Sequence, residues 1–219
     1  MIIPSDADYK ETKRLKEGKA SLSYPEKELA RWIEVEYGES VLNVRYDTII
    51  PDNQARLCIV FDYSSSEMRF RSGELGNYDA EKQYQIRNRY VEIANGTTVG
   101  NRSLENLLVT FQSFERVARI EANESIPDKK IGQLKDQICN SAIWEISRCF
   151  ESATFFLFTI EQLNQLTTDV RMEYDHRYNE LARKYDTNGY FARTKIDVAF
   201  DSKENFDKNY GGSWFNYYQ

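Results

Sequence analysis

The sequence has few of the residues on which common enzyme classes depend. Histidine occurs once, at His176, which excludes zinc or iron sites built from several histidines and leaves one candidate for a histidine general base. The surroundings of His176 by helical spacing are polar, so we expect a solvated surface residue. No Gly-x-Ser-x-Gly motif occurs, and the ten glycines form no phosphate-binding loop. Serine hydrolysis and nucleotide-dependent catalysis of the common kinds are therefore disfavoured.

Long hydrophobic runs and paired cysteines are also missing. The most hydrophobic stretch, Ala153 to Ile160, is far shorter than the roughly 18 residues of a membrane-spanning helix. The N-terminus lacks the order of a secretory signal. Cys58, Cys139 and Cys149 are odd in number and lack metal-ligand spacing. These features predict a cytoplasmic protein with no membrane partner, no metal and no cofactor.

What the sequence does contain is a sizeable hydrophobic fraction and an excess of acid. The 219 residues are 41% hydrophobic and include 15 tyrosines, enough for one large domain or two small ones. The net charge is −6, from 35 acidic and 29 basic side chains. A charge of this sign disfavours nucleic acid and favours a basic protein partner. Solubility alone is the simpler explanation of this net charge.

Hydrophobic periodicity and turn residues predict an α+β fold. We expect an N-terminal helical arm over residues 1–20 and a single α+β domain over 21–219, with possible sub-units 21–100 and 101–219. Gly38 has the position of a helix stop, and Thr159 and Gln162 have the spacing of a capping box. The predicted helices span 5–19, 24–37, 79–95, 103–122, 128–151, 160–185 and 201–209. The predicted strands span 41–50, 55–63, 66–72, 153–158, 193–200 and 213–218.

The expected core is a mixed or antiparallel sheet of about five strands, packed by three long helices. Runs 41–50 and 55–63 form a hairpin whose second strand is hydrophobic on both faces, as in a central strand. The helices 103–122 and 128–151 pack as an antiparallel pair. The other strands of the sheet are 153–158, 193–200 and 213–218, and the third long helix is 160–185.

One short echo raises the question of an internal repeat. The letters ELAR occur at 28–31 and at 180–183, and each copy is followed by a break and a strand that ends in Phe-Asp. A duplicated helix-strand unit and coincidence both explain this echo, and four-residue matches arise easily by chance.

The chain ends in a cluster of aromatic residues after a Gly-Gly pair. The alternation of side chains in 213–218 predicts a terminal strand docked on the sheet. The alternative is an exposed aromatic patch that anchors a protein partner, since Trp and Tyr dominate binding hot spots. The candidate protein-binding residues are Tyr210, Trp214, Phe215, Tyr217 and Tyr218.

Aspartates near strand ends offer the best alternative, an acidic catalytic site. Asp47, Asp62, Asp197 and Asp201 occupy such positions, where metal-dependent hydrolases and nucleases often hold carboxylates. Asp201 also has the spacing of a helix cap with Glu204, and Asp62 precedes a serine-rich turn. Capping and turn roles explain these residues without catalysis.

The leading hypothesis is a non-catalytic protein-binding protein, with no catalytic residues assigned. Its concrete form is a bacterial or phage-encoded inhibitor, such as an immunity protein that neutralises a toxin. One alternative is the metal-dependent hydrolase or nuclease that uses the four aspartates. A second is a homo-oligomeric structural protein joined through the C-terminal aromatic residues. Segment 66–102 mixes aromatic and basic residues but carries a near-zero net charge, so nucleic acid is an unlikely partner.

Overall fold

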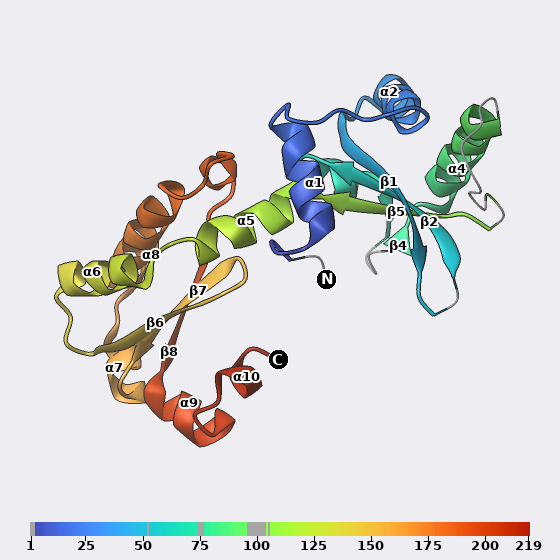
Figure 1. Cartoon of the computed structure of the whole chain (residues 1–219). Coiled ribbons are helices and arrows are strands. Elements are labelled where there is room, and N and C mark those ends of the chain that lie inside the picture. The colour runs from blue at the N-terminus through green and yellow to red at the C-terminus, as the bar shows by residue number, and fades with distance from the viewer. Residues whose placement is uncertain (1–2, 52, 74–76, 96–103, 105) are drawn as a thin grey trace. The chain divides into compact units, whose positions relative to one another are not determined.

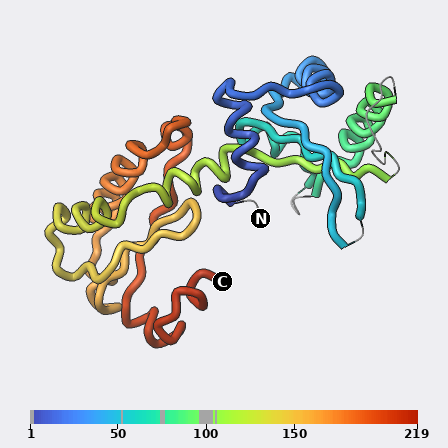
Figure 2. The backbone as a smooth tube through the Cα atoms, viewed as in Figure 1, coloured from blue at the N-terminus to red at the C-terminus, as the bar shows by residue number. Residues whose placement is uncertain are grey.

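The computed structural model describes residues 3–51, 53–73, 77–95, 104 and 106–219. The chain divides into two compact units, Met1–Val117 and Ala118–Gln219, which are drawn in Figures 1 and 2. The division falls inside a helix, whereas the possible sub-units expected from the sequence met at 100/101. The fold is α+β, as predicted. In place of one five-stranded sheet, the described residues form two sheets of three strands and one of two.

The first unit is a three-stranded sheet with helices around it. The sheet has the order β1-β2-β5, with β2 antiparallel to β1 and parallel to β5. A small sheet, β3-β4, is inserted between α3 and α4. The elements are α1 (Ala7–Lys16), α2 (Glu26–Tyr37), β1 (Val41–Ile49), β2 (Gln54–Phe61), α3 (Ser64–Met68), β3 (Arg71–Ser72), β4 (Asn77–Tyr78), α4 (Ala80–Asn95), β5 (Leu108–Ser113) and the first turn of α5 (Phe114–Glu124), whose remainder belongs to the second unit.

The central strand β2 explains why this unit has a core. Leu57, Ile59 and Phe61 are fully buried and pack in one cluster with residues of α2 and α4. Cys58 and Val60 are also buried and point to the other face, where α1 lies against β1. The hairpin and the central position of its second strand are confirmed. Gly38 ends α2 in the left-handed conformation, with φ 69°, as predicted.

The second unit repeats this arrangement with a sheet of order β6-β7-β8. Strand β7 is antiparallel to β6 and parallel to β8. Helices α6 and α8 cover one face, and Phe155 and Tyr178 are fully buried in the core between them. The elements are α6 (Asp128–Ile138), β6 (Ile143–Cys149), β7 (Ser152–Leu157), α7 (Ile160–Gln165), α8 (Thr168–Arg183), the short 3-10 helix η1 (Tyr190–Ala192), β8 (Asp197–Ser202), α9 (Lys203–Tyr210) and α10 (Trp214–Tyr217).

The two units therefore share one order of elements, which is an internal structural repeat. Each runs helix, β-hairpin, short helix, long helix, parallel strand and helix. A glutamate in the first turn of the last helix makes the same two bonds in both units. Its N–H donates to a carbonyl just after the central strand, and its carboxylate accepts the first N–H of the short helix. These residues are Glu115, Asp62 and Ser64 in the first unit, and Glu204, Phe158 and Ile160 in the second.

The ELAR echo does not mark this repeat. The copy at 28–31 lies in α2, the helix before the hairpin, whereas the copy at 180–183 ends α8, the long helix after it. The two Phe-Asp pairs are not equivalent either. Phe61 is the last residue of the central strand β2, whereas Phe200 and Asp201 lie within the edge strand β8. The match in letters joins elements that are not equivalent, so it is a coincidence.

Two long helices predicted from the sequence are wrong in part. Over 103–122, residues 103 and 105 lie outside the described residues, and 108–113 form β5 before α5 begins at Phe114. Over 128–151, the helix ends at Ile138 because Cys139 adopts the left-handed conformation, and β6 follows. In both segments hydrophobic residues recur at helical spacing, but pairing with a central strand overrides that pattern. In the described part of these segments, the two long helices expected to pair are replaced by the shorter helices α5 and α6 and two strands.

Three smaller predictions also need correction. In the predicted strand 66–72, residues 66–68 belong to helix α3, 69 and 70 form a turn, and only Arg71–Ser72 are in a strand. The helix expected over 160–185 is two helices, because Leu166 is extended and Thr167 caps a new helix. The last strand, 213–218, is the short helix α10. The capping box of Thr159 and Gln162 is confirmed by both of its hydrogen bonds.

None of the helices in the described ranges combines the length and the hydrophobicity needed to cross a membrane.

Candidate protein-binding surface

The C-terminal helix α10 is held firmly on one face of the second sheet. Gly211 and Gly212 both have positive φ, 61° and 68°, and this conformation lets the chain turn back after α9. Ser213 then caps α10 by accepting the N–H of Asn216. Tyr217 donates its hydroxyl to Asp201 at 2.7 Å, and Tyr218 donates to Ser147 at 2.8 Å. These bonds replace the strand pairing expected for this segment.

Aromatic rings of β7 and α9 pack against the same segment. Phe156 of β7 is fully buried, and its ring centroid lies 5.3 Å from that of Trp214 and 5.1 Å from that of Tyr217. Phe206 of α9 lies 4.2 Å from Trp214. The T-shaped and tilted ring pairs around Phe156 are favourable geometries for aromatic contacts. The face opposite α6 and α8 therefore has an aromatic core of its own.

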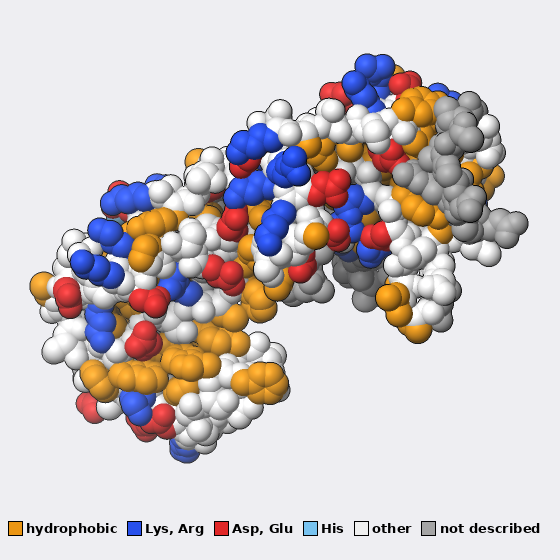
Figure 3. Space-filling view, in the orientation of Figure 1, with side chains coloured by type: hydrophobic (Ala, Val, Ile, Leu, Met, Phe, Trp, Pro, Cys, Tyr) orange, Lys and Arg blue, Asp and Glu red, His pale blue; other side chains and the backbone are white. Residues whose placement is uncertain are grey.

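A groove of about 610 Å³ opens beside this core. Its floor is aromatic: the Trp214 ring is nearly parallel to those of Trp144 and Tyr218, at 5.9 Å and 6.0 Å between centroids. Its rim is acidic, formed by the exposed side chains of Glu124, Asp128 and Glu145. We call these six residues the aromatic groove. In Figure 3, hydrophobic side chains gather in a band across this unit near β6 and α10.

The basic residue at the groove, Arg148, already forms hydrogen bonds and an ion pair within the protein. Arg148 donates to the carbonyl oxygens of Asn123 and Ile126 and forms an ion pair with Asp128 at 2.6 Å. The side chain of Asp128 remains 96% exposed, so one of its oxygens faces solvent. The rim therefore presents acidic groups to a ligand.

The predicted aromatic residues differ in their exposure. Phe215 is 75% exposed and Trp214 is 38% exposed, whereas Tyr210, Tyr217 and Tyr218 are half-buried. Burial and then the hydrogen bond to Asp201 raise the pKa of Tyr217, so this hydroxyl remains a donor at neutral pH. Trp214 and Phe215 are the members of the set that a partner can reach most easily.

The four aspartates of the alternative acidic site fall in two pairs, one in each unit. Asp62 of the first unit binds Lys16 through both oxygens at 2.8 Å. Asp201 of the second unit accepts from Asn205 and Tyr217, and Asp197 is exposed at the start of β8. Among the described residues, no group of three or more His, Cys, Asp or Glu side chains has the arrangement of a metal site.

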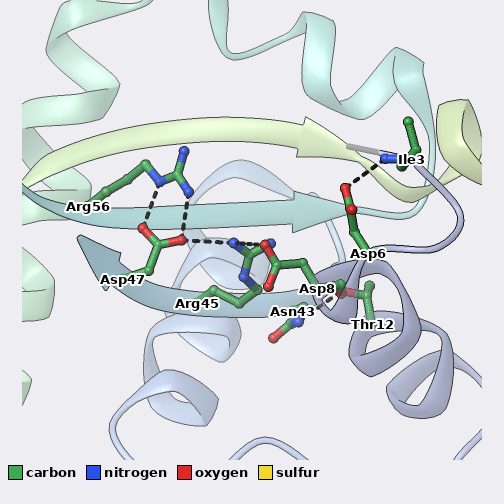
Figure 4. A network of polar contacts seen from close by, with 8 residues as sticks. All are labelled: Ile3, Asp6, Asp8, Thr12, Asn43, Arg45, Asp47 and Arg56. Carbon is green, nitrogen blue, oxygen red and sulfur yellow. Dashed lines mark hydrogen bonds and ion pairs between the residues drawn. The ribbon is translucent and has the colours of Figure 1, made fainter. Parts of the chain in front are cut away.

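Asp47 is the centre of an ion-pair network on the first sheet (Figure 4). It accepts two hydrogen bonds from Arg56, at 2.8 Å and 2.6 Å, and one from Arg45 at 2.8 Å. Arg45 also pairs with Asp8 of α1 at 2.6 Å. Burial alone would raise the pKa of Asp47, but the hydrogen bonds from the two arginines outweigh it and lower the pKa. The network ties α1 to the sheet.

Replacing Asp47 by asparagine is expected to lower the free energy of unfolding of the first unit by about 1–2 kcal/mol at pH 7. The folded state holds the pKa of Asp47 below its unfolded value, so its contribution is present at neutral pH and is lost as pH falls through the folded pKa. Urea unfolding between pH 7 and pH 3 should show the two proteins converge at low pH. A difference that stays constant with pH would contradict the charge interaction.

His176 lies on the exposed side of α8, as predicted, and its Nε2 is 3.5 Å from Glu180. It lines a groove of about 490 Å³ between α6 and α8. The other charged groups there are the acids Glu173 and Glu180 and the bases Lys130, Arg177 and Lys184. This mixed set contains no serine or cysteine nucleophile, so it is a solvated surface of mixed charge.

The half-buried Trp144 and the buried Phe206 complete the aromatic cluster around α10 but were not predicted from the sequence. Trp144 falls in the segment assigned to the helix 128–151, which hid its place on a strand. The alternation of buried Ile143 and Ile146 with exposed or half-buried Trp144 and Glu145 includes a β-bulge, which weakens the period-two signal. The one sequence signal for Trp144 is a weakly alternating segment, interrupted by a bulge, directly before the clearly predicted strand 153–158.

Comparisons with protein-family models, with curated proteins and with solved structures gave no match. The inference of function therefore depends on the aromatic groove and its surroundings.

Proposed function

We propose that this chain is a non-catalytic protein-binding protein and that the aromatic groove, together with the neighbouring exposed ring of Phe215, holds a basic segment of its partner. The observation that carries the proposal is the rigid, partly exposed Trp214 stacked beside Trp144 under an acidic rim. Aromatic faces attract the cationic groups of Lys and Arg. Carboxylates around them favour the same cations, and rigid aromatic residues are common binding hot spots.

A bacterial or phage-encoded inhibitor, such as an immunity protein, is the concrete form of this proposal. Such a protein has to find a toxic partner quickly in the cytoplasm. The net charge of −6 would speed association with a basic target. This form is an analogy from charge and surface chemistry, and the partner itself has to be found by experiment.

The two alternatives have weaker support. A hydrolase would need carboxylates free to hold a metal ion, and Asp47, Asp62 and Asp201 are each bonded to side chains of the protein. A symmetric dimer through the C-terminal aromatic residues would bring the acidic rims of both copies into one interface. Repulsion between those carboxylates disfavours such a dimer.

Capture with matched variants tests the proposal. The wild-type chain and Phe215→Ser would be immobilised and exposed to an extract of the organism that encodes the protein. A captured protein would be identified by mass spectrometry, purified and titrated against each variant. Loss of the exposed Phe215 ring is expected to weaken binding at least roughly tenfold, which is the effect of a hot-spot residue.

Met172→Ser is the matched control, because Met172 is also an exposed hydrophobic residue of the second unit, at 64%. It lies on α8, away from the face that carries α10. The Met172→Ser variant should bind the partner with the affinity of the wild type. An equal loss of affinity in both variants, or no loss of affinity in Phe215→Ser, would contradict the proposal. A metal-dependent turnover that disappears in Asp62→Asn or Asp201→Asn would instead support the hydrolase.

A further inference from the structure

Strands β5 and β8 occupy equivalent edges of the two sheets. Each is parallel to the central strand of its sheet, and the registers correspond: Phe61 pairs with Ser113, and Leu157 pairs with Ser202. By this register Val109 of β5 corresponds to Val198 of β8. In the same way Phe111 corresponds to Phe200, two residues further along each strand.

The edge of β5 is closed by side chains. Gln83 of α4 donates its side-chain amide to the carbonyl of Val109 at 2.5 Å, and Tyr78 donates its hydroxyl to the carbonyl of Phe111 at 3.2 Å. Tyr78 belongs to the small β3-β4 sheet. The second unit has no such insertion, since α7 ends at Gln165 and α8 begins at Thr168. Its edge strand therefore lacks this cover.

The edge of β8 is closed at its two ends but open in the middle. The Asn179 amide bonds both the N–H and the C=O of Ile196, at 2.8 Å and 3.3 Å. The N–H of Ser202 donates to Asp201 Oδ1 at 2.7 Å. Alternate residues of a strand point their backbone groups to the same side, so Val198 and Phe200 also point away from β7. Within the described ranges, no hydrogen bond is found for their outward N–H and C=O groups.

The side chains beside this open edge indicate the chemistry of an occupant. Asp197, Ala199 and Asp201 share the face opposite α8, and Asp197 and Ala199 are exposed. On the other face Val198 and Phe200 are half-buried against the core. An added strand with basic residues on the first face and β-branched residues on the second would match both.

A second copy of this chain fits the edge poorly. Antiparallel pairing of β8 with itself uses all four open groups only when Val198 lies opposite Phe200 of the second copy. That register places Asp197 opposite Asp201, and like charges directly opposite each other destabilise a strand pair. Charge complementarity therefore favours a basic segment of a different protein.

We propose that the edge of β8 accepts an extended segment of a partner protein as a fourth strand, with Lys or Arg facing the exposed carboxylate of Asp197. Strand addition of this kind derives affinity from main-chain hydrogen bonds and specificity from alternate side chains. Exposed edges of sheets are usually protected, and this unit leaves one unprotected. The proposal is independent of the aromatic groove.

The first test is amide hydrogen exchange, measured by NMR on the full chain. In the free protein the amides of Val198 and Phe200 should exchange at least tenfold faster than those of Ala199 and Asp201. A capped seven-residue peptide that alternates Lys and Val should slow both amides at least tenfold, and a Glu-Val peptide should not. Equal protection in the free protein, or no slowing by the Lys-Val peptide, would overturn the proposal.

Substitutions locate the binding on the edge. Val198→Pro removes an outward N–H, which an edge strand tolerates, and should abolish peptide protection at Phe200, whereas Val198→Thr should retain it. Asp197→Lys should reverse the preference, so that the Glu-Val peptide binds and the Lys-Val peptide does not. This variant tests the proposal even if the proline variant does not fold. Phe215→Ser should leave peptide binding unchanged. Retention of binding by a folded Val198→Pro variant, or a dimer through β8, would overturn the proposal.

Discussion

Replacing Phe156 by alanine is expected to lower the free energy of unfolding of the second unit by about 3–5 kcal/mol. The Phe156 side chain is fully buried and lies against the rings of Trp144, Phe206, Trp214 and Tyr217. A cavity at this point removes the contacts that hold α10 on the sheet. Urea unfolding, followed through the amide protection of β7, measures the loss.

Phe155 supplies the control, because it is the next residue, equally buried, and points to the opposite face. Phe155→Ala should cost a comparable free energy. The milder Phe155→Leu and Phe156→Leu variants should both remain folded, and only Phe156→Leu should weaken binding of the partner. Equal effects of the two leucine variants on binding would show that the aromatic face has no special part in it.

The second large effect is expected at Asn123, whose replacement by alanine should lower the free energy of unfolding of the same unit by about 2–4 kcal/mol. The Asn123 side chain is fully buried. It donates to the carbonyl oxygens of Phe150 and Ser152 at 2.8 Å and 3.0 Å. It also accepts the Tyr178 hydroxyl at 2.6 Å. Its removal leaves the buried Tyr178 hydroxyl without a partner, at about 1–3 kcal/mol. The two carbonyl bonds are part-buried, and each contributes about 0.5–1.5 kcal/mol.

Tyr178→Phe separates the parts of this network, since it removes the hydroxyl and leaves both carbonyl bonds of Asn123 intact. Its loss of stability should be less than half that of Asn123→Ala in thermal unfolding of the full chain. If Tyr178→Phe is as unstable as Asn123→Ala, most of the stabilisation by Asn123 comes from its single bond with the Tyr178 hydroxyl. That result would contradict the role given to the carbonyl bonds between α5 and the β6–β7 turn.

The sequence was sufficient where structure is set by neighbours along the chain. Alternation and a turn predicted the hairpin of β1 and β2, and Gly38 and the Thr159 capping box marked helix ends. These signals depend on residues within a few positions of one another. Both central strands, β2 and β7, were also found, because they are hydrophobic on both faces.

The sequence failed where pairing with a distant strand decides the structure. Strands β5 and β6 contain hydrophobic residues at helical spacing, yet each pairs with a central strand and becomes extended. The terminal segment shows the converse: its alternation predicts a strand, but the Ser213 cap and the bond from Tyr217 to Asp201 favour a helix. Both outcomes depend on tertiary contacts that local periodicity does not encode.

The candidate surface was found in part for the same reason. Aromatic composition identified Trp214, Phe215 and the terminal tyrosines, whereas Trp144 and Phe206 join them only through the folding of β6 and α9. The internal repeat was also hidden, since its evident signs are equivalent hydrogen bonds of Glu115 and Glu204 rather than shared letters.

The most direct test of the protein-binding account uses the three tryptophans of the chain, Trp32, Trp144 and Trp214. Their indole N–H resonances would be followed by NMR as the purified captured partner is added. Trp144 and Trp214 line the aromatic groove, whereas Trp32 packs against the core of the first unit. We expect the first two resonances to shift and that of Trp32 to stay. A complex that forms while Trp144 and Trp214 remain unchanged would contradict the account.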